Sequence, residues 1–253
     1  MSDMIPVAYE DLCNALREAQ GTDNGGMGNH MWGVVVNRLG AVVAVAFSGE
    51  EQGDQWPGSR LIAAQKANTA NAMSLDEMAL ATAHLYSGSQ PGGFMYGITS
   101  TPMNIDAAYG GNPLQYGSKK DHLVGRPIGG VCVFAGGLAL YSADGAIAGG
   151  LGVSGDTSCA DHNIAWKVRH LLELDHVPKG VNPIVVPGKA PDDNIVYDID
   201  PQTAKSASGW GHPECPGTSK LIAMDLPERY PIRSRVSSVI TGETETPSPA
   251  HSR

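Results

Sequence analysis

The residues best suited to binding chemistry lie where a glycine-rich segment meets the start of a predicted helix. Residues 152–156 read GVSGD and precede a helix expected over 157–172. The first turn of a helix has free backbone N–H groups and the positive end of the helix dipole, which suit a carboxylate, propionate or phosphate. Glycine also allows a ligand close to the backbone, although a plain turn or β-bulge is the structural alternative. The predicted ligand-contacting residues are Gly136, Gly137, Ser154, Gly155 and His162.

Acid–base chemistry is predicted for Lys66, Asp161 and His162. Asp161 and His162 stand side by side near the start of the helix over 157–172, whose N-terminus disfavours a charged imidazolium. A neutral histidine there suits metal ligation or general-base catalysis, and the alternative is an exposed helix histidine. Lys66 lies among alanines and asparagines, where it offers a cation to an acidic ligand unless it is simply solvated.

A second chemical motif is the sequence GWGHPECPG, which contains His212 and Cys215. A HxxC pair on a loop ordered by Pro and Gly suits metal binding or a reactive thiolate, but two ligands do not complete a metal site. The metal candidates are therefore His162, His212 and Cys215. The wide spacing of the cysteines, without a CxxC, disfavours a zinc cage or redox pair and favours a reducing compartment, so we expect a cytoplasmic protein. The four cysteines are Cys13, Cys132, Cys159 and Cys215.

The elements that must position these residues are helices and antiparallel strands. Periodic or helix-favouring patterns predict helices over 8–20, 59–73, 74–86 and 157–172, and β-branched runs predict hairpins with turns at 37–40 and 143–145. The capping-box spacing of Ser74 and Glu77 marks the start of the third helix. Short turns imply antiparallel pairing, and helices that occur in blocks favour an α+β fold over a parallel, doubly wound sheet.

The helix over 157–172 has a clear apolar face. Ile164, Val168 and Leu171 are spaced so that they face the sheet. Lys167 and Arg169 fall between them and are therefore expected in solvent.

The chain is predicted to divide into a core domain and a C-terminal extension. Residues 1–174 form the domain and include a Gly- and Pro-rich insertion over about 87–129. The extension, 175–241, carries short apolar runs but no periodicity that would give it a core of its own, so we expect it to pack on the domain or on a neighbouring subunit. Residues 242–253 are expected to form a disordered tail.

Composition argues against two classes of partner. The 253 residues include 17 Lys+Arg and 26 Asp+Glu, a net charge of −9, with no basic run that would bind nucleic acid. The sequence has no apolar run of about 18 residues that would span a membrane, and its start has no signal-peptide pattern. We therefore expect no nucleic-acid and no membrane partner.

Four stretches in order resemble the GlcG-like family, whose relatives include haem-binding secreted proteins and the C-terminal domain of PduO-type proteins. The stretches are residues 34–46, 59–72, 134–155 and 156–165. The resemblance covers residues 8–173 without the insertion, and it implies a profilin- or PAS-like antiparallel sheet flanked by helices, assembling into homo-oligomers. Some relatives bind haem through differing iron ligands. The chain departs from the family pattern at Asn37, where Asp is usual, and in its insertion and extension.

Three functions are compatible with these observations. The resemblance implies a small-ligand-binding protein for haem or a related tetrapyrrole. The alternative is a lyase, isomerase or hydrolase acting on a small acidic or aromatic metabolite, although no nucleophile elbow, P-loop, HExxH or dinucleotide fingerprint is present. A structural oligomer without a ligand is the third, and it is favoured if side chains fill the region around Gly136 and Ser154.

Overall fold

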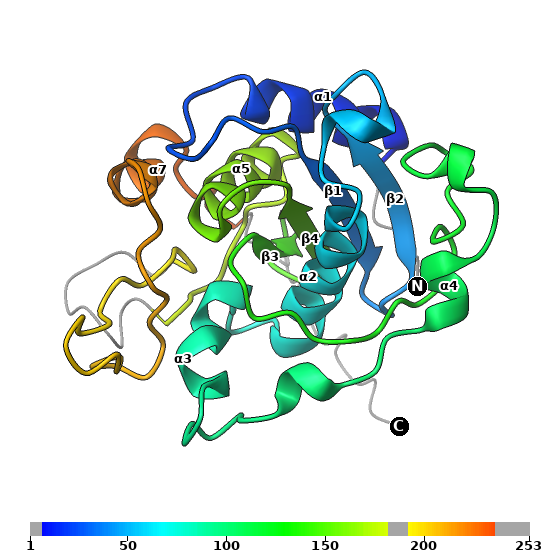
Figure 1. Ribbon diagram of the computed structural model, residues 1–253. Helices are drawn as coiled ribbons and strands as arrows, with labels where there is room; N and C mark the ends of the chain where they lie inside the picture. Colours follow the sequence, from blue (N-terminus) through cyan, green and yellow to red (C-terminus); the bar gives the residue numbers. More distant parts are fainter. Residues whose placement is uncertain (1–6, 182–191, 236–253) are drawn as a thin grey trace, which may run out of the picture.

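A four-stranded antiparallel sheet organises the computed structural model, which describes residues 7–181 and 192–235 (Figure 1). The strands are β1 (Trp32–Asn37), β2 (Val42–Phe47), β3 (Gly137–Tyr141) and β4 (Ile147–Ser154), in the order β2-β1-β4-β3. The main helices are α1 (Tyr9–Gln20), α2 (Ser59–Met73), α5 (Ser158–Leu171) and α7 (Ser219–Arg229). Shorter ones are α3 (Tyr86–Ser89), α4 (Ile105–Tyr109) and the 3-10 turns Gln52–Asp54, Thr82–Leu85, Ile98–Ser100 and Pro113–Gln115. The predicted α+β class is confirmed.

Both faces of the sheet are covered by helices, because the strands are apolar on both sides. Along β1, Val35 packs in a core shared with α1 and α5, whereas Val34 and Val36 pack in a second core against α2. This alternation follows from the period of two in a strand. Figure 1 shows the resulting three layers, with α1 and α5 on one side of the sheet and α2 on the other.

Helix α2 lies unusually close to β4, and glycine makes that possible. A Cβ atom added at Gly152 would lie 1.9 Å from the carbonyl oxygen of Ala63, and one at Gly150 would lie 2.2 Å from that of Ala67. Any larger residue would push the helix away from the strand. The close approach carries Lys66 of α2 onto the end of β4, where the candidate site lies.

Two local predictions are wrong. The helix predicted over 74–86 does not form; instead the Ser74 hydroxyl, directly after α2, accepts a hydrogen bond from the Leu80 N–H at 2.9 Å and holds a turn. Lys167 and Arg169 are not in solvent but are 3% and 0% exposed, because other segments cover the outer side of α5. Lys167 Nζ donates to the Asn24 side chain at 2.7 Å.

The insertion and the extension both contact the core domain. Within the insertion, residues 87–129, the Gly125 N–H donates to the Val42 carbonyl of β2 at 2.8 Å. In the extension, α7 packs against α5, and the Trp166 indole N–H donates to the Tyr230 carbonyl at 3.0 Å. The predicted tail, 242–253, lies outside the described residues. None of the described helices is long and apolar enough to cross a membrane.

Candidate functional site

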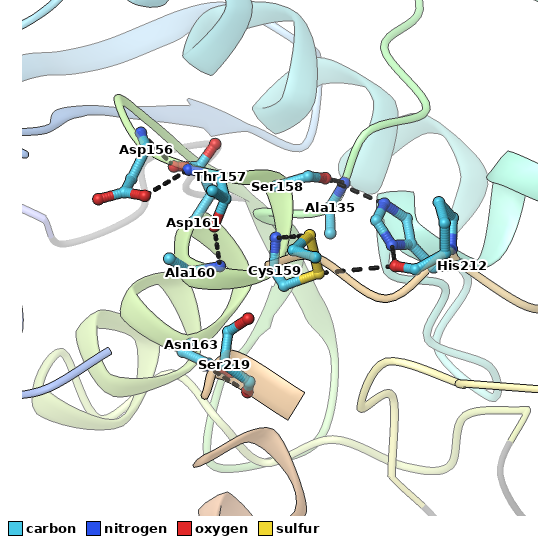
Figure 2. The surroundings of a disulfide bond; sticks show 12 residues. Ala135, Asp156, Thr157, Ser158, Cys159, Ala160, Asp161, Asn163, His212 and Ser219 are labelled. Atoms are coloured by element: carbon cyan, nitrogen blue, oxygen red, sulfur yellow. Dashed lines mark hydrogen bonds between the residues drawn. A yellow bond between two sulfur atoms is a disulfide. The ribbon is translucent and has the colours of Figure 1, made fainter. Parts of the chain in front are cut away.

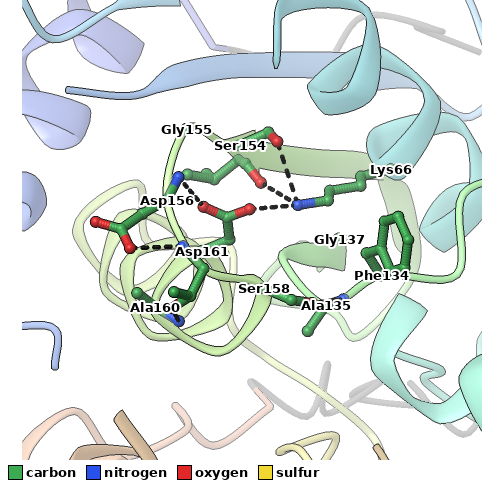
Figure 3. A network of polar contacts seen from close by, with 12 residues as sticks. Lys66, Phe134, Ala135, Gly137, Ser154, Gly155, Asp156, Ser158, Ala160 and Asp161 are labelled. Atoms are coloured by element: carbon green, nitrogen blue, oxygen red, sulfur yellow. Dashed lines mark hydrogen bonds and ion pairs between the residues drawn. The ribbon is translucent and has the colours of Figure 1, made fainter. Parts of the chain in front are cut away.

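Lys66 and Asp161 form a buried ion pair beneath the N-terminus of α5 (Figure 3). Lys66 Nζ lies 2.6 Å from Asp161 Oδ2 and also donates to the Val153 carbonyl at 3.0 Å. The other carboxylate oxygen accepts the Asp156 N–H at 2.9 Å. Lys66 and Asp161 are therefore brought together as candidates, but their side chains are only 1% and 3% exposed.

The protonation of Asp161 is set by two opposed effects. Burial raises its pKa to about 6, and this outweighs the attraction of the Lys66 ammonium, which acts to lower it. The carboxyl therefore exchanges its proton in the range used by general acids and bases.

The predicted ligand-contacting residues surround this pair, but side chains fill the space beside them. Gly136 has φ +107°, and a Cβ there would lie 3.0 Å from Lys66 Nζ and 2.6 Å from the Val153 carbonyl oxygen. A Cβ at Gly137 would lie 2.5 Å from Thr82 Cγ2, and Ser154 and Gly155 are buried. A ligand reaches these residues only if Lys66 or its neighbours move.

His162 points away from Lys66 and Asp161, into the interior. Its Nε2 lies 3.2 Å from the Asn194 amide oxygen, its Nδ1 has no hydrogen-bond partner, and its side chain is fully buried. Burial lowers the pKa of His162 to about 3, so the ring is neutral because it is buried. The predicted trio of Lys66, Asp161 and His162 is thus not assembled.

His212 instead reaches the first turn of α5 from the extension (Figure 2). Its Nδ1–H donates to the Pro213 carbonyl at 2.8 Å, and its Nε2 accepts the Ser158 hydroxyl at 3.0 Å. The Ser158 oxygen also accepts the Ala135 N–H at 2.8 Å, which fixes its position. Burial lowers the pKa of His212 to about 4, so the imidazole is neutral with its proton on Nδ1.

Cys159 and Cys215 form a disulfide beside this histidine, although the cysteine spacing disfavoured a redox pair and favoured a reducing compartment (Figure 2). The two residues are 56 positions apart, and no local pattern connects them. Disulfides are rare in reducing compartments, so cysteine usage does not support a cytoplasmic location. The remaining cysteines, Cys13 and Cys132, are buried and unpaired.

One aromatic ring contacts His212, and a pair of aromatic rings includes Trp210, two residues before it. The Tyr86 ring lies 5.3 Å from the imidazole, and Phe94 contacts Trp210 edge to face at 6.2 Å. Phe94 is 74% exposed, and Phe134, next to Ala135, is 53% exposed. We call Tyr86, Phe94, Phe134 and Trp210 the aromatic rim.

A separate cavity of about 480 Å³ lies between α2 and α4. Arg60, Met103, Tyr109 and Tyr116 are among its lining residues. None of the sequence-predicted site residues lines it. The Arg60 guanidinium is already paired through two nitrogens with the buried Asp121 carboxylate, at 2.5 and 2.9 Å.

Comparison with known proteins decides the family. A family model described as haem degrading protein HbpS-like matches residues 10–169. The chain belongs to the HbpS-like family. This confirms the resemblance seen in the sequence.

Two solved structures are similar to this HbpS-like chain. One is the crystal structure of a PduOC–haem complex, with 25% identity, a TM-score of 0.45, and coverage of 66% of this chain and 95% of that one. The other is the Klebsiella pneumoniae protein ORFY, a DUF336 protein, with 19% identity, a TM-score of 0.44, and coverage of 68% and 96%. No curated protein matches the chain.

In this HbpS-like protein, the sequence did not indicate that Ser158 and Cys159 lie next to His212. Thr157 caps the start of α5, which leaves the Ser158 hydroxyl to hydrogen-bond His212. Cys159 has no other cysteine nearby in sequence, so its spacing gave no sign of its pairing with Cys215. Cys159 does lie in the same helix turn as the candidate Asp161, but no sequence pattern connects that turn to the HPEC motif.

Proposed function

We propose that this protein binds haem or a related tetrapyrrole, with His212 as the residue that ligates the iron. Membership of the HbpS-like family supports a haem ligand. The observation that carries the assignment to His212 is its hydrogen bonding, with Nδ1–H on the Pro213 carbonyl and Nε2 held only by the Ser158 hydroxyl. Bound haem would supply an iron centre that the neutral imidazole of His212 could ligate.

His212 has the outer-shell arrangement that metal-ligating histidines use. Such histidines donate one ring N–H to a carbonyl or carboxylate, which fixes the tautomer and leaves the other nitrogen free to ligate. The Pro213 carbonyl fills the first role for His212. Because His212 is only 2% exposed, binding requires the Ser158 hydroxyl to turn away and open Nε2. Ser158 itself is partly exposed, so this opening lies at the surface.

The aromatic rim suits the flat, apolar face of a tetrapyrrole. Phe94 and Phe134 together leave large apolar surfaces in water. Covering such surface stabilises a complex by about 25 cal/mol per Å². Stacked or edge-on aromatic contacts add further attraction to a planar ring.

His162 is a weaker candidate for the iron ligand. Its Nε2 faces Asn194 and its side chain is fully buried, so ligation would require the interior to open. Gly136, Gly137, Ser154 and Gly155 stay predictions as ligand contacts, since all four residues are buried.

Hemin titration tests the proposal. Purified protein is titrated with hemin while the Soret band is recorded, for the wild type and for His212→Ala and Ser158→Ala. We expect the His212→Ala variant to lose the axial-ligand signature and to bind about tenfold or more weakly. Ser158→Ala should bind at least as tightly as wild type, because it frees Nε2.

Tyr109→Ala serves as the matched control, because it changes the separate cavity between α2 and α4. It should bind hemin as wild type does. An unchanged spectrum in His212→Ala, together with weakened binding in Tyr109→Ala, would move the ligand to that cavity. No Soret shift in the wild type would overturn haem binding itself.

An enzymatic role stays a prediction. Lys66 and Asp161 have the residue types for acid–base work, but both are buried. Steady loss of the Soret band in the hemin titration, abolished by Asp161→Asn, would favour turnover of the ligand. A homo-oligomer and a cytoplasmic location also stay predictions.

A further inference from the structure

Three metal-ligating side chains converge where the extension meets α5. Cys159 is in the first turn of α5, whereas His212 and Cys215 lie on the loop that precedes α7. One ligand atom from each of the three lies within 4.8 Å of the other two. Among residues 7–181 and 192–235, this is the only such group of three His, Cys, Asp or Glu side chains. The two cysteines are joined as a disulfide.

We infer that opening this disulfide creates a binding site for a zinc-type divalent cation, with Cys159, His212 and Cys215 as its ligands. In a tetrahedral zinc site with Zn–S of about 2.3 Å and Zn–N of about 2.0 Å, neighbouring ligand atoms lie roughly 3.3–3.8 Å apart. The Cα atoms of the two cysteines are 5.9 Å apart, and the ligand atoms already lie within 4.8 Å of one another. Side-chain rotations that move the ligand atoms by about 1–2 Å therefore bring them to the spacing of a zinc site.

The surroundings favour negatively charged sulfur at this place. The Cys159 backbone N–H points at Cys215 Sγ, 3.1 Å away, and both sulfurs lie at the positive end of α5. Helix N-termini and N–H donors stabilise thiolates, which are the ligating form of cysteine. Two thiolates and one imidazole form a soft donor set that suits zinc better than magnesium or calcium. The fourth position is left to water.

The step is a two-electron thiol–disulfide exchange followed by metal binding. A dithiol reductant attacks the S–S bond and leaves as its own disulfide, and the two electrons and two protons it gives up convert Cys159 and Cys215 to thiols. The metal then displaces the two thiol protons as it binds. Cys215 is partly exposed between the exposed residues Glu214 and Pro216, so a reductant reaches the bond from solvent.

This inference does not depend on haem binding, although both use His212. In the disulfide form, His212 is available to another ligand, whereas in the reduced form it completes the metal site. The test contains no haem, so its outcome is separate from that of the hemin titration.

Cobalt provides the direct readout. Full-length protein is reduced with a phosphine under anaerobic conditions and titrated with Co²⁺, which reports thiolate ligation by charge-transfer absorption and tetrahedral geometry by its visible bands. We expect one cobalt per chain, displaced by Zn²⁺, and no such bands in the oxidised protein. His212→Ala should weaken binding by roughly tenfold or more, and Cys215→Ser should remove the two-thiolate signature.

The matched control replaces the two cysteines outside the group. The double variant Cys13→Ser/Cys132→Ser should bind Co²⁺ as wild type does, because neither residue belongs to the cluster. Circular dichroism of each reduced variant checks that it is folded, and His212→Gln provides a second variant if His212→Ala is not. The inference is overturned if reduced wild type shows no thiolate–cobalt absorption, or if Cys215→Ser keeps it unchanged.

Discussion

Two buried ion pairs anchor the same helix, α5, and they differ in how fully each charge is satisfied. Near its start, Asp161 receives one cationic nitrogen, Lys66 Nζ, at 2.6 Å, and its other oxygen accepts the Asp156 backbone N–H at 2.9 Å. Near its end, Arg169 donates two hydrogen bonds to the Asp193 carboxylate, at 2.6 and 2.7 Å, and a third to the Ala139 carbonyl at 3.1 Å.

The difference appears in the two carboxyl groups. Burial opposes ionisation of both. For Asp193 the attraction and hydrogen bonds of Arg169 outweigh burial and lower the pKa below its usual value. For Asp161 burial outweighs Lys66, and the pKa rises to about 6. Two hydrogen bonds from one guanidinium thus keep the Asp193 carboxylate ionised, whereas one hydrogen bond from an ammonium leaves the Asp161 carboxyl able to exchange its proton.

The comparison assigns different tasks to the two ends of α5. The Arg169 pair fastens the segment that begins at Asp192 to the core domain. The Lys66 pair lies beneath Ser158 and His212, where the proposed ligand chemistry takes place. Four experiments test this contrast.

Deleting the segment that carries Asp193, the partner of Arg169, should have the largest effect on stability. Truncation after Glu173 deletes Asp193, His212 and α7 and leaves Arg169 buried without its carboxylate. Losing one partner of a buried pair costs about 3–5 kcal/mol, a large share of a typical domain's stability. We expect insoluble protein or no cooperative thermal transition. A soluble truncated chain with unchanged Tm and an unchanged number of subunits by light scattering would show that the extension is dispensable.

Breaking the pair of Arg169 and Asp193 at one residue should be the next most damaging change. Arg169→Met leaves the Asp193 charge buried and should lower the free energy of unfolding by about 3–5 kcal/mol, measured by urea denaturation. The double variant Arg169→Met/Asp193→Leu should recover part of this loss. Lys120→Met, at an exposed lysine, is the control and should change stability by less than about 0.5 kcal/mol. An equal change in the control would refute this role of the pair.

Breaking the other pair should cost less. Lys66→Met should lower the free energy of unfolding by about 1–3 kcal/mol, because Asp161 takes up a proton instead of staying charged. The folded pKa of Asp161 lies above its unfolded value of 3.8. The contribution of this carboxyl to the free energy of unfolding is therefore full below pH 3.8 and is lost as the pH rises through about 6. The cost of Lys66→Met should therefore be larger at pH 8 than at pH 5. If Lys66→Met and Arg169→Met lower the free energy of unfolding equally at both pH values, the two ion pairs do not differ as proposed.

The smallest effect is a titration that leaves the fold intact. Carbon-13 NMR of the aspartate carboxyl carbons should show Asp161 titrating with a midpoint near its pKa of about 6, assigned by the loss of its signal in Asp161→Asn. Asp193 should stay ionised to a lower pH than an ordinary aspartate. Matching midpoints for the two groups would show that contact with two guanidinium nitrogens, rather than with one ammonium, does not separate their pKa values.

The chemistry of the site was only half visible in the sequence. Lys66 and Asp161 were predicted as acid–base candidates, and the structure joins them because Gly150 and Gly152 let α2 lie against β4. His162 was paired with Asp161 through adjacency, yet neighbouring helix positions point in different directions, and its ring faces Asn194. Adjacency in a helix does not predict contact between side chains.

The sequence by itself determined the elements whose causes are local. The turn at 37–40, the helix near 8–20 and the α+β class follow from turn residues and from apolar periods of about 3.6 and 2. Local patterns failed at Ser74. The capping-box spacing predicted the start of a helix there, but the Ser74 hydroxyl instead accepts a hydrogen bond from the Leu80 backbone N–H.

Only the tertiary structure decided which side of α5 meets solvent and which residues meet His212. Periodicity located the apolar face of α5 but carries no information on a second layer, and the extension and the loop at Asn24 bury Arg169 and Lys167. The pairing of Cys159 with Cys215 across 56 residues depends on how the whole chain folds back. Local patterns are set by neighbours in sequence, whereas burial, charge pairing and ligand convergence are set by neighbours in space.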